Sequence, residues 1–437
     1  MLERYRQASP NSSQLWNRAQ KVFCGGVNHN IRIFGLNSCQ AHPPFMHRGE
    51  GSHIWDVDGN EYIDYWMTHY CMILGHNPPQ IRQVLEQRLR EGWHLGTLNE
   101  AQVIFAEKIQ EAIPELEKMR FCTTGSESTM YATRLARLFT GRKLVAKAWG
   151  GWHGGNDALG YHLKYPYTDD AYYNGVSFDY NDMRSVDTLM KKHGKQLAAV
   201  VIEPVLGAGG GIEPDSEFLP YLREETEARD ILLIFDEIIT GFRLCYGSAG
   251  IQLYGVKPDL QTHGKVLAGG LPIGVYGGRE DVMALAVPGA PRGRWVGGGT
   301  FSSHPLTMTA GLTTLEILKS YKEKYVTLNQ RGDQLRRQIN NVLERANASE
   351  RAMGKGSILF IHSLKEPLKE GPITAGKLGK VFDTEKTNVF QSRLLEEGVF
   401  GYHGLGVVSF VHTEDDFSKT LNAIENVVTT ETNNVKH

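Results

Sequence analysis

Short apolar runs that end in a charged residue dominate the centre of the chain. Residues 231–235 are large and apolar and are followed by Asp236, and residues 197–202 are apolar and are followed by Glu203. Unbroken apolar runs of this kind predict strands buried on both faces of a sheet. Stretches with apolar residues at helical spacing separate them, which predicts an α/β domain with a mostly parallel sheet. Further strands are expected at residues 119–122 and 144–148, and helices at residues 80–91, 100–111, 126–139 and 215–229.

The pattern changes on both sides of this centre. Residues 49–64 alternate apolar and polar positions around a turn signal at residues 58–60, which predicts a β-hairpin. Towards the C-terminus, a helix is expected at residues 326–345 and a strand at residues 358–364. We therefore expect an N-terminal segment belonging to a small domain, a large α/β domain and a C-terminal α+β part of the small domain, at residues 1–79, 80–325 and 326–437.

Composition narrows the class of protein without identifying it. The 437 residues are 41% hydrophobic and 22% charged with a net charge of −2, which is ordinary for a globular protein and gives no electrostatic case for nucleic acid or an anionic membrane. Every apolar run is shorter than the roughly 18 residues of a transmembrane helix, and residues 1–20 lack a signal-peptide core. We expect a cytoplasmic location. The five cysteines are widely spaced without a C-x-x-C, so neither a disulfide framework nor a metal site is expected.

Asp236 and Lys265 are the strongest candidates for chemistry. Ligands in open α/β sheets bind outside the carboxyl ends of the strands, where Asp236 is expected. A buried carboxylate needs a partner, and pyridoxal phosphate supplies one because an acid opposes its protonated ring nitrogen while a lysine bonds it. Lys265 is flanked by small and apolar residues, where desolvation would leave its amine nucleophilic. Taken singly, a structural acid and a surface lysine are the plainer interpretations.

Two motifs suit a phosphate group. Thr124, Gly125 and Ser126 come between a predicted strand and a predicted helix, where free N–H groups and the helix dipole favour an anion. A simple N-cap is the alternative. Thr300 follows three glycines, and such a loop can offer a hydroxyl and an N–H to a phosphate or can be a plain connection.

Two further motifs suit an aromatic ring and its surroundings. Trp152 lies among glycines that leave its face free, so it could stack on a flat heteroaromatic ring or pack on the domain surface. His153 could support that ring or bond to the backbone. Glu203 closes a strand as Asp236 does, and it could organise the pocket floor or form a structural salt bridge.

Together these residues resemble the class III aminotransferases of fold type I, and within them the glutamate-1-semialdehyde 2,1-aminomutase-like branch. The resemblance runs from about residue 11 to the C-terminus. Its most specific segments are residues 25–28 with Arg32, 55–60, 72–76, 236–243, 264–265 and 269–272. It implies the fold of type I transferases that depend on pyridoxal phosphate (PLP), which is an α/β fold with a mostly parallel sheet in the large domain and an α+β small domain.

The resemblance also implies roles for individual residues. PLP would be the cofactor, with Lys265 as its Schiff-base lysine and Asp236 at its ring nitrogen. The remaining implied cofactor contacts are Trp152 and Ile238 on the two faces of the ring, and Gly125, Ser126 and Thr300 at the phosphate. In the family, the threonine matched by Thr300 reaches the phosphate in the partner subunit, so a homodimer is implied.

The sequence departs from the aminomutase pattern on the substrate side. His29 and Asn30 replace a serine and a proline, His69 replaces a pocket tryptophan, and Ala208 replaces an asparagine. Arg32 is retained, and a guanidinium suits bidentate capture of a carboxylate. Other segments resemble β-amino acid aminotransferases of the same branch, at residues 150–155, 180–182 and 277–285.

We therefore expect a PLP-dependent aminotransferase that moves an amino group between an amino acid or amine, β-amino acids included, and an oxo acid. An aminomutase or an amino-acid epimerase on the same cofactor is the nearest alternative. A non-catalytic α/β protein that binds an anion or a nucleotide is the alternative from another class. The sequence lacks a P-loop and lacks G-x-G-x-x-G at a first βα turn, which disfavours this last alternative.

Overall fold

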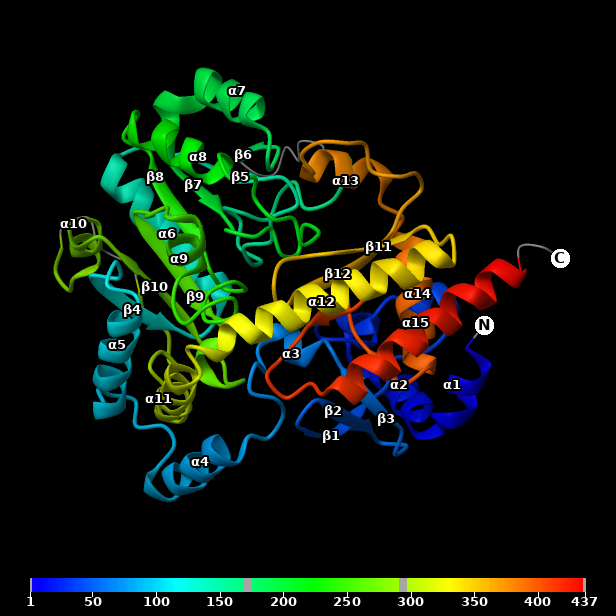
Figure 1. Cartoon of the computed structure of the whole chain (residues 1–437). Coiled ribbons are helices and arrows are strands. Elements are labelled where there is room, and N and C mark those ends of the chain that lie inside the picture. Colours follow the sequence, from blue (N-terminus) through cyan, green and yellow to red (C-terminus); the bar gives the residue numbers. More distant parts are fainter. Residues whose placement is uncertain (1, 168–174, 291–296, 435–437) are drawn as a thin grey trace. The chain divides into compact units, whose positions relative to one another are not determined.

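The computed structural model describes residues 2–167, 175–290 and 297–434, which fall into two compact units (Figure 1). Unit 1 takes its residues from 1–78, 328–368 and 381–437, and unit 2 takes its residues from 79–327 and 369–380. The sequence pattern assigned residues 369–380 to the C-terminal part instead.

Polar contacts explain why residues 369–380 belong to unit 2. The carboxylate of Asp179 accepts hydrogen bonds from Thr374 Oγ1 and from the backbone N–H of Gly376, each at 2.8 Å. Asn181 Nδ2 donates to the carbonyl of Ile373 at 3.0 Å. These contacts are made by polar side chains, so the hydrophobic periodicity of the sequence could not predict that residues 369–380 attach to unit 2.

Unit 2 is built on a seven-stranded sheet in the order β4-β10-β9-β8-β7-β5-β6. Strand β10 is antiparallel to both of its neighbours and the other strand pairs are parallel, so the expected mostly parallel sheet is confirmed. The carboxyl ends of β4, β5, β7, β8 and β9 therefore meet at one edge of the sheet. The strands are β4 Lys118–Cys122, β5 Leu144–Ala148, β6 Gly175–Phe178, β7 Leu197–Ile202, β8 Leu232–Asp236, β9 Leu260–Gly264 and β10 Gly274–Gly278.

Helix α6 (Gly125–Thr140) covers one face of this sheet, and the residues it packs against show which strand side chains point to that face. Leu232 and Ile234 of β8 belong to the apolar core that includes Leu135 of α6. Side chains alternate along a strand, so Asp236 points to the same face. The other helices of unit 2 include α4 Pro79–Glu91, α5 Glu100–Ala112, α7 Met183–His193, α8 Phe218–Glu227, α9 Ala249–Tyr254, α10 Glu280–Met283 and α11 Pro305–Ser320.

Unit 1 contains the predicted hairpin, formed by β2 (His53–Asp56) and β3 (Glu61–Asp64) in antiparallel register. The buried carboxylate of Asp56 fixes the turn, because Oδ1 accepts from the backbone N–H groups of Asp58 at 3.0 Å and Asn60 at 2.9 Å. The other strands of unit 1 are β1 Met46–Glu50, β11 Glu350–Met353, β12 Ile358–Ser363, β13 Val399–Phe400 and β14 Gly406–Val407. Its helices include α1 Glu3–Ala8, α2 Pro10–Val22, α14 Thr384–Glu396 and α15 Glu414–Asn434. Two more helices have residues in both units, namely α12 Lys324–Arg345 and α13 Ala375–Val381.

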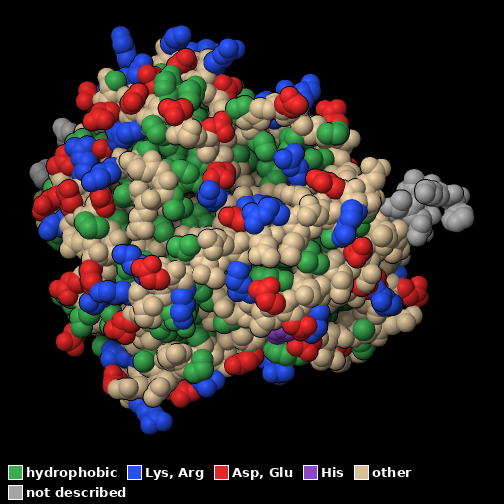
Figure 2. All heavy atoms as spheres, in the orientation of Figure 1, with side chains coloured by type: hydrophobic (Ala, Val, Ile, Leu, Met, Phe, Trp, Pro, Cys, Tyr) green, Lys and Arg blue, Asp and Glu red, His purple; other side chains and the backbone are tan. Residues whose placement is uncertain are grey.

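The surface carries charges of both signs. On the face drawn in Figure 2, acidic and basic side chains are interspersed. Across the described ranges, none of the helices combines the length and the apolar character that a membrane span requires.

Candidate active site

The carboxyl edge of the unit 2 sheet brings Asp236 and Lys265 close to each other. Asp236 ends β8, and it pairs in register with Thr262 of the neighbouring strand β9. Lys265 directly follows β9, where the chain turns with a φ of 45°. A left-handed backbone costs roughly 1–2 kcal/mol for a residue with a side chain and persists where the surroundings fix it, as at active sites.

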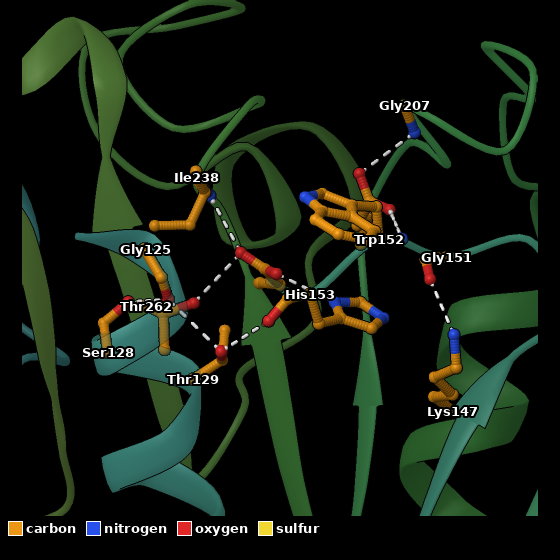
Figure 3. Close-up of polar contacts among 12 residues, drawn as sticks. Gly125, Ser128, Thr129, Lys147, Gly151, Trp152, His153, Gly207, Ile238 and Thr262 are labelled. Carbon is orange, nitrogen blue, oxygen red and sulfur yellow. Dashed lines mark hydrogen bonds and ion pairs between the residues drawn. The ribbon is translucent and has the colours of Figure 1, made fainter. Parts of the chain in front are cut away.

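Asp236 is buried and is held at both carboxylate oxygens by residues that Figure 3 labels, namely Thr262, Ile238 and His153. Oδ1 accepts hydrogen bonds from Thr262 Oγ1 at 3.0 Å and from the backbone N–H of Ile238 at 3.1 Å. Oδ2 lies 2.8 Å from Nδ1 of His153. The adjacent acid Glu237 is engaged elsewhere, by Ser248 and the N–H of Gly250, so of these two neighbouring acids Asp236 is the one held at this edge.

His153 is fully buried beside Asp236. Burial lowers the pKa of the imidazole, and the hydrogen bond and charge of Asp236 act in the opposite direction. A neutral ring that donates Nδ1–H to the carboxylate fits both facts. The carbonyl of His153 accepts from Thr129 Oγ1 at 2.6 Å, which ties this segment to helix α6.

Glu203 is a second buried acid at the same edge, directly after β7. Burial and the charge of Asp236 raise its pKa to about 8. Its two oxygens accept from the backbone N–H groups of Trp152 at 3.3 Å and Gly207 at 3.1 Å. Glu203 therefore holds the loops that carry Trp152 and Gly207 at this edge.

The start of α6 presents free backbone N–H groups of the kind that can bind an anion. Thr124 is the N-cap: its Oγ1 accepts from the N–H of Glu127, and its own N–H donates to the Glu127 carboxylate. The N–H groups of Gly125 and Ser126 come next and have no acceptor within the helix. A Cβ on Gly154 would lie 2.5 Å from Cα of Ser126, so a glycine is required for this loop to approach the helix.

Thr300 is exposed and follows Gly297, Gly298 and Gly299, whose φ angles are 109°, 114° and 132°. Side chains rarely tolerate such values, so the three glycines allow this loop its path. The loop lies against helix α6, because Tyr131 Oη donates to the carbonyl of Gly298 at 3.2 Å.

The three predicted substrate residues lie in unit 1, where they line a pocket of about 650 Å³. His69 belongs to a turn in which Met67–Tyr70 have φ angles between 44° and 72°, a left-handed run that residues with side chains rarely adopt. Its ring stacks on Trp66 at 4.5 Å and meets His29 edge-on at 6.0 Å. Burial and the charge of Arg32 lower the pKa of His29.

Comparison with known proteins identifies the family. The model of the family described as aminotransferase class-III matches residues 37–428, which is nearly the whole chain. The chain is a class III aminotransferase.

Relatives of this class III aminotransferase include both mutases and transaminases. A glutamate-1-semialdehyde 2,1-aminomutase of Thermodesulfovibrio yellowstonii is 36% identical over 430 residues, covering 94% of this chain and 97% of the relative. The solved structure of a β-phenylalanine aminotransferase from Variovorax paradoxus is 29% identical with a TM-score of 0.86, covering 98% of this chain and 96% of that one. A transaminase with PLP bound is 26% identical with a TM-score of 0.85, covering 97% and 99%. These matches confirm the type I transferase fold.

The family and its PLP-bound member indicate an enzyme with PLP as cofactor, and the residues at the unit 2 edge fit that group. Asp236 Oδ2 accepts one bond from the protein and keeps a lone pair for a ring N–H. A Cβ on Gly125 or on Gly264 would lie 3.1 Å from Ile238, so two glycines make room for the side chain that would pack on the ring. Trp152 is 38% exposed, which leaves its face available.

Sequence reasoning missed two polar residues of this class III aminotransferase site. Thr262 bonds Asp236 from the neighbouring strand, a contact that follows from strand register. Lys147 is fully buried in β5, and its Nζ donates to the carbonyl of Gly151 at 2.7 Å. The sequence signal that could have revealed Lys147 is a single lysine inside an otherwise apolar strand.

Proposed function

We propose that this enzyme transfers an amino group between an amino acid or amine, β-amino acids included, and an oxo acid, with PLP bound at the unit 2 edge. The observation that carries the proposal is Asp236, a buried carboxylate held by Thr262 and His153 on the strand next to the one that leads into Lys265. PLP bound at this edge and protonated at its ring nitrogen would withdraw electrons from the carbon of a substrate that has displaced the lysine, and it would carry the amino group between the half-reactions.

Each side chain has a defined task in this proposal. Lys265 would bond the cofactor and, once the amino donor displaces it, would move a proton from the substrate carbon to the cofactor carbon as general base and then acid. Asp236 keeps the ring nitrogen protonated, and His153 and Thr262 hold Asp236 in place. Trp152 and Ile238 enclose the ring, and the N–H groups of Gly125 and Ser126 bind the phosphate.

The test of the proposal is whether turnover requires an amino acceptor. The purified enzyme, loaded with PLP, is mixed with one amino donor, and its visible absorption is followed before and after an oxo acid is added. We expect the donor alone to bleach the absorption in a single turnover and the oxo acid to restore it. A protein that shows no visible absorption after added PLP would contradict the proposal.

An aminomutase is the second candidate, because the mutase of T. yellowstonii is 36% identical over nearly the whole chain. It predicts that glutamate-1-semialdehyde is isomerised continuously with no acceptor present. Isomerisation without any transfer to an oxo acid would replace the first proposal with this one, and the same experiment with an α-amino acid would detect an epimerase by racemisation.

Arg32 is proposed to bind the substrate carboxylate, because its guanidinium lines the unit 1 pocket and suits bidentate capture. His29 and His69 would border the same subsite. For an Arg32→Gln variant, we expect the KM of a carboxylate-bearing donor to rise about 10- to 100-fold with little change in kcat, since a charged hydrogen bond is worth about 1.5–3 kcal/mol.

Steady-state kinetics with two donors would check this prediction. An amine that lacks a carboxylate is the internal control, because its KM should be unaffected by Arg32→Gln. Arg18→Gln, on the exposed side of α2, is the matched control variant. Equal losses for both donors would show that Arg32 does not bind the carboxylate.

A homodimer in which Thr300 reaches the partner's cofactor phosphate is also proposed. Large apolar side chains are exposed next to Thr300: Leu98 is 83% exposed, Trp93 59% and Phe301 55%. Asn99 Nδ2 donates to the carbonyl of Ser303 at 3.0 Å, which joins the two segments into one surface. Exposed apolar patches of this kind mark interaction sites.

We expect a Leu98→Asp variant to raise the dimer dissociation constant at least about tenfold, because the charge would be desolvated at the contact. Sedimentation velocity across a dilution series measures it, with Val326→Asp as an exposed apolar control outside this surface. A wild-type protein that stays monomeric at micromolar concentration would rule the homodimer out. A cytoplasmic location without nucleic-acid or membrane partners stays a prediction from the sequence, which cell fractionation would check.

A further inference from the structure

Lys147 is a buried cation that the mechanism above does not use. It lies in β5 with no exposed surface, and its Nζ donates to the carbonyl of Gly151 at 2.7 Å (Figure 3). Nζ also lies 5.2 Å from the ring centre of Tyr161, a cation–π distance. The group therefore contacts the loop that carries Trp152 and His153.

Stability alone does not account for a lysine at this position. Removing an ammonium group from water is unfavourable, and burial lowers the pKa of Lys147 to about 7, against the opposing charge of Glu203. Apolar residues of similar volume often replace buried charges at no loss of stability. A methionine would fill the same space without desolvating a charge, so the lysine points to a task that a methionine cannot perform.

Strand register places three charged residues around one loop. Lys147 of β5 pairs with Val201 of β7, which pairs with Ile234 of β8. Two residues beyond Val201 and Ile234 come Glu203 and Asp236, so by alternation all three charged side chains point to the face that α6 covers.

Three successive residues of the loop are held by these side chains. Lys147 bonds the carbonyl of Gly151, Glu203 accepts from the N–H of Trp152 at 3.3 Å, and Asp236 bonds the ring of His153 at 2.8 Å. The loop has little stiffness of its own, because Gly150 has a φ of 74° and Gly151 carries no side chain. A Cβ on Gly151 would lie 2.8 Å from Nε2 of His153, so residue 151 must be a glycine. A glycine has no side chain of its own to fix the loop, and the loop is held by contacts from other residues.

We propose that Lys147 is a positioning residue that holds the Gly151 carbonyl and thereby sets Trp152 and His153 against the PLP ring and Asp236. The inference rests on the proposed function, because it assumes that PLP binds at this edge. It assigns to the Lys147 amine the task of holding the loop in one geometry in the folded enzyme, and it gives Lys147 no contact with substrate.

The test compares Lys147→Met with wild type in cofactor binding and in stability. Apoenzyme is titrated with PLP and followed by absorption and tryptophan fluorescence, and thermal unfolding of the apoenzyme is measured in parallel. We expect PLP to bind at least about tenfold more weakly, since a charged hydrogen bond is lost, while the apoenzyme unfolds at nearly the same temperature. We also expect the absorption of the bound cofactor to titrate at a shifted pH, because His153 and Asp236 would no longer be fixed.

Two further variants sharpen the result. Lys143→Met makes the same exchange at an exposed position just before β5 and should leave both measurements unchanged. Lys147→Arg keeps a cationic donor and should bind PLP more tightly than Lys147→Met. If Lys147→Arg binds PLP as weakly as Lys147→Met does, the hydrogen bond donated by residue 147 does not determine PLP affinity, and the proposal is overturned.

The remaining outcomes are also decisive. A Lys147→Met apoenzyme that unfolds at a much lower temperature, or fails to fold, would overturn the proposal, because Lys147 would then be a structural residue. Unchanged PLP affinity and an unchanged spectrum in Lys147→Met, with wild type binding PLP, would overturn this inference alone. Failure of the wild-type apoenzyme to bind PLP would overturn the proposed function and this inference with it.

Discussion

Replacing Lys265 with alanine is expected to lower kcat/KM by at least about a thousandfold, because one side chain would supply both the bond to the cofactor and the proton transfer. Alanine keeps the turn that follows β9, since small residues already surround it and the left-handed φ of 45° is then strained no more than before. Rates with one donor and one oxo acid give the comparison, and the absorption of the bound cofactor shows whether the bond to lysine is lost.

Lys257→Ala is the matched control for this variant. Lys257 lies just before the amino end of β9, at the opposite edge of the sheet, where its exposed ammonium pairs with Glu115 at 3.2 Å. Its loss should change turnover little, because exposed ion pairs contribute about 0–1 kcal/mol to stability. Partial recovery of Lys265→Ala by a small added amine would assign proton transfer to the lost side chain. Turnover of Lys265→Ala at the wild-type rate would remove Lys265 from the mechanism.

Three of the strands that sequence reasoning located in the large domain are buried almost throughout. Residues 144–148, 197–202 and 231–235 were expected as strands, and β5, β7 and β8 occupy these positions within a residue. A strand with helices on both faces is usually a nearly continuous apolar run, and such a run is recognisable in a sequence. Parallel strands end at one edge, and the register of β7 with β8 puts the acids that follow them, Glu203 and Asp236, at neighbouring positions of that edge.

Strands β9 and β10 escaped the same reasoning for physical reasons. The β9 strand carries polar residues where it meets the site, among them Thr262, which bonds Asp236. The β10 strand is rich in glycine because its neighbours lie close: a Cβ on Gly274 would lie 2.2 Å from the carbonyl oxygen of Thr124, and one on Gly277 2.4 Å from that of Lys118. Glycine in a sequence predicts a turn as readily as a tight strand contact.

The polar environment of the site was the least predictable part. The bonds from Thr262 to Asp236 and from Lys147 to Gly151 depend on which residues face each other across strands and loops. A sequence specifies this only through the register that the folded sheet adopts. The N-cap role of Thr124 was the plainer of its two interpretations, and the hydrogen bonds of the capping box agree with it.

Asp236→Asn is expected to lower kcat on the order of 100- to 1000-fold, because breaking a buried charge pair costs about 3–5 kcal/mol and part of that is lost at the transition state. Asparagine keeps the shape of the side chain, and its oxygen can still accept from Thr262 and from the N–H of Ile238. Its amide cannot keep a ring nitrogen protonated, and it would face Nδ1 of His153 with donor against donor unless the imidazole changes tautomer.

Asp259→Asn is the matched control, because Asp259 is a buried aspartate at the other edge of the same sheet. Its carboxylate accepts from Arg223 at 2.8 Å and from Arg279 at 2.7 Å, so Asp259→Asn leaves both guanidinium groups without this opposing charge. We expect Asp259→Asn to lower the free energy of unfolding while kcat per folded enzyme stays near wild type. Asp236→Asn should lower kcat without a comparable loss of stability in the apoenzyme, because the lost bond to His153 is offset by removing a charge that, together with burial, raises the pKa of Glu203. An Asp236→Asn enzyme that loses stability and keeps its kcat would make Asp236 a structural acid, and the charge opposite the ring nitrogen would then have to come from another residue.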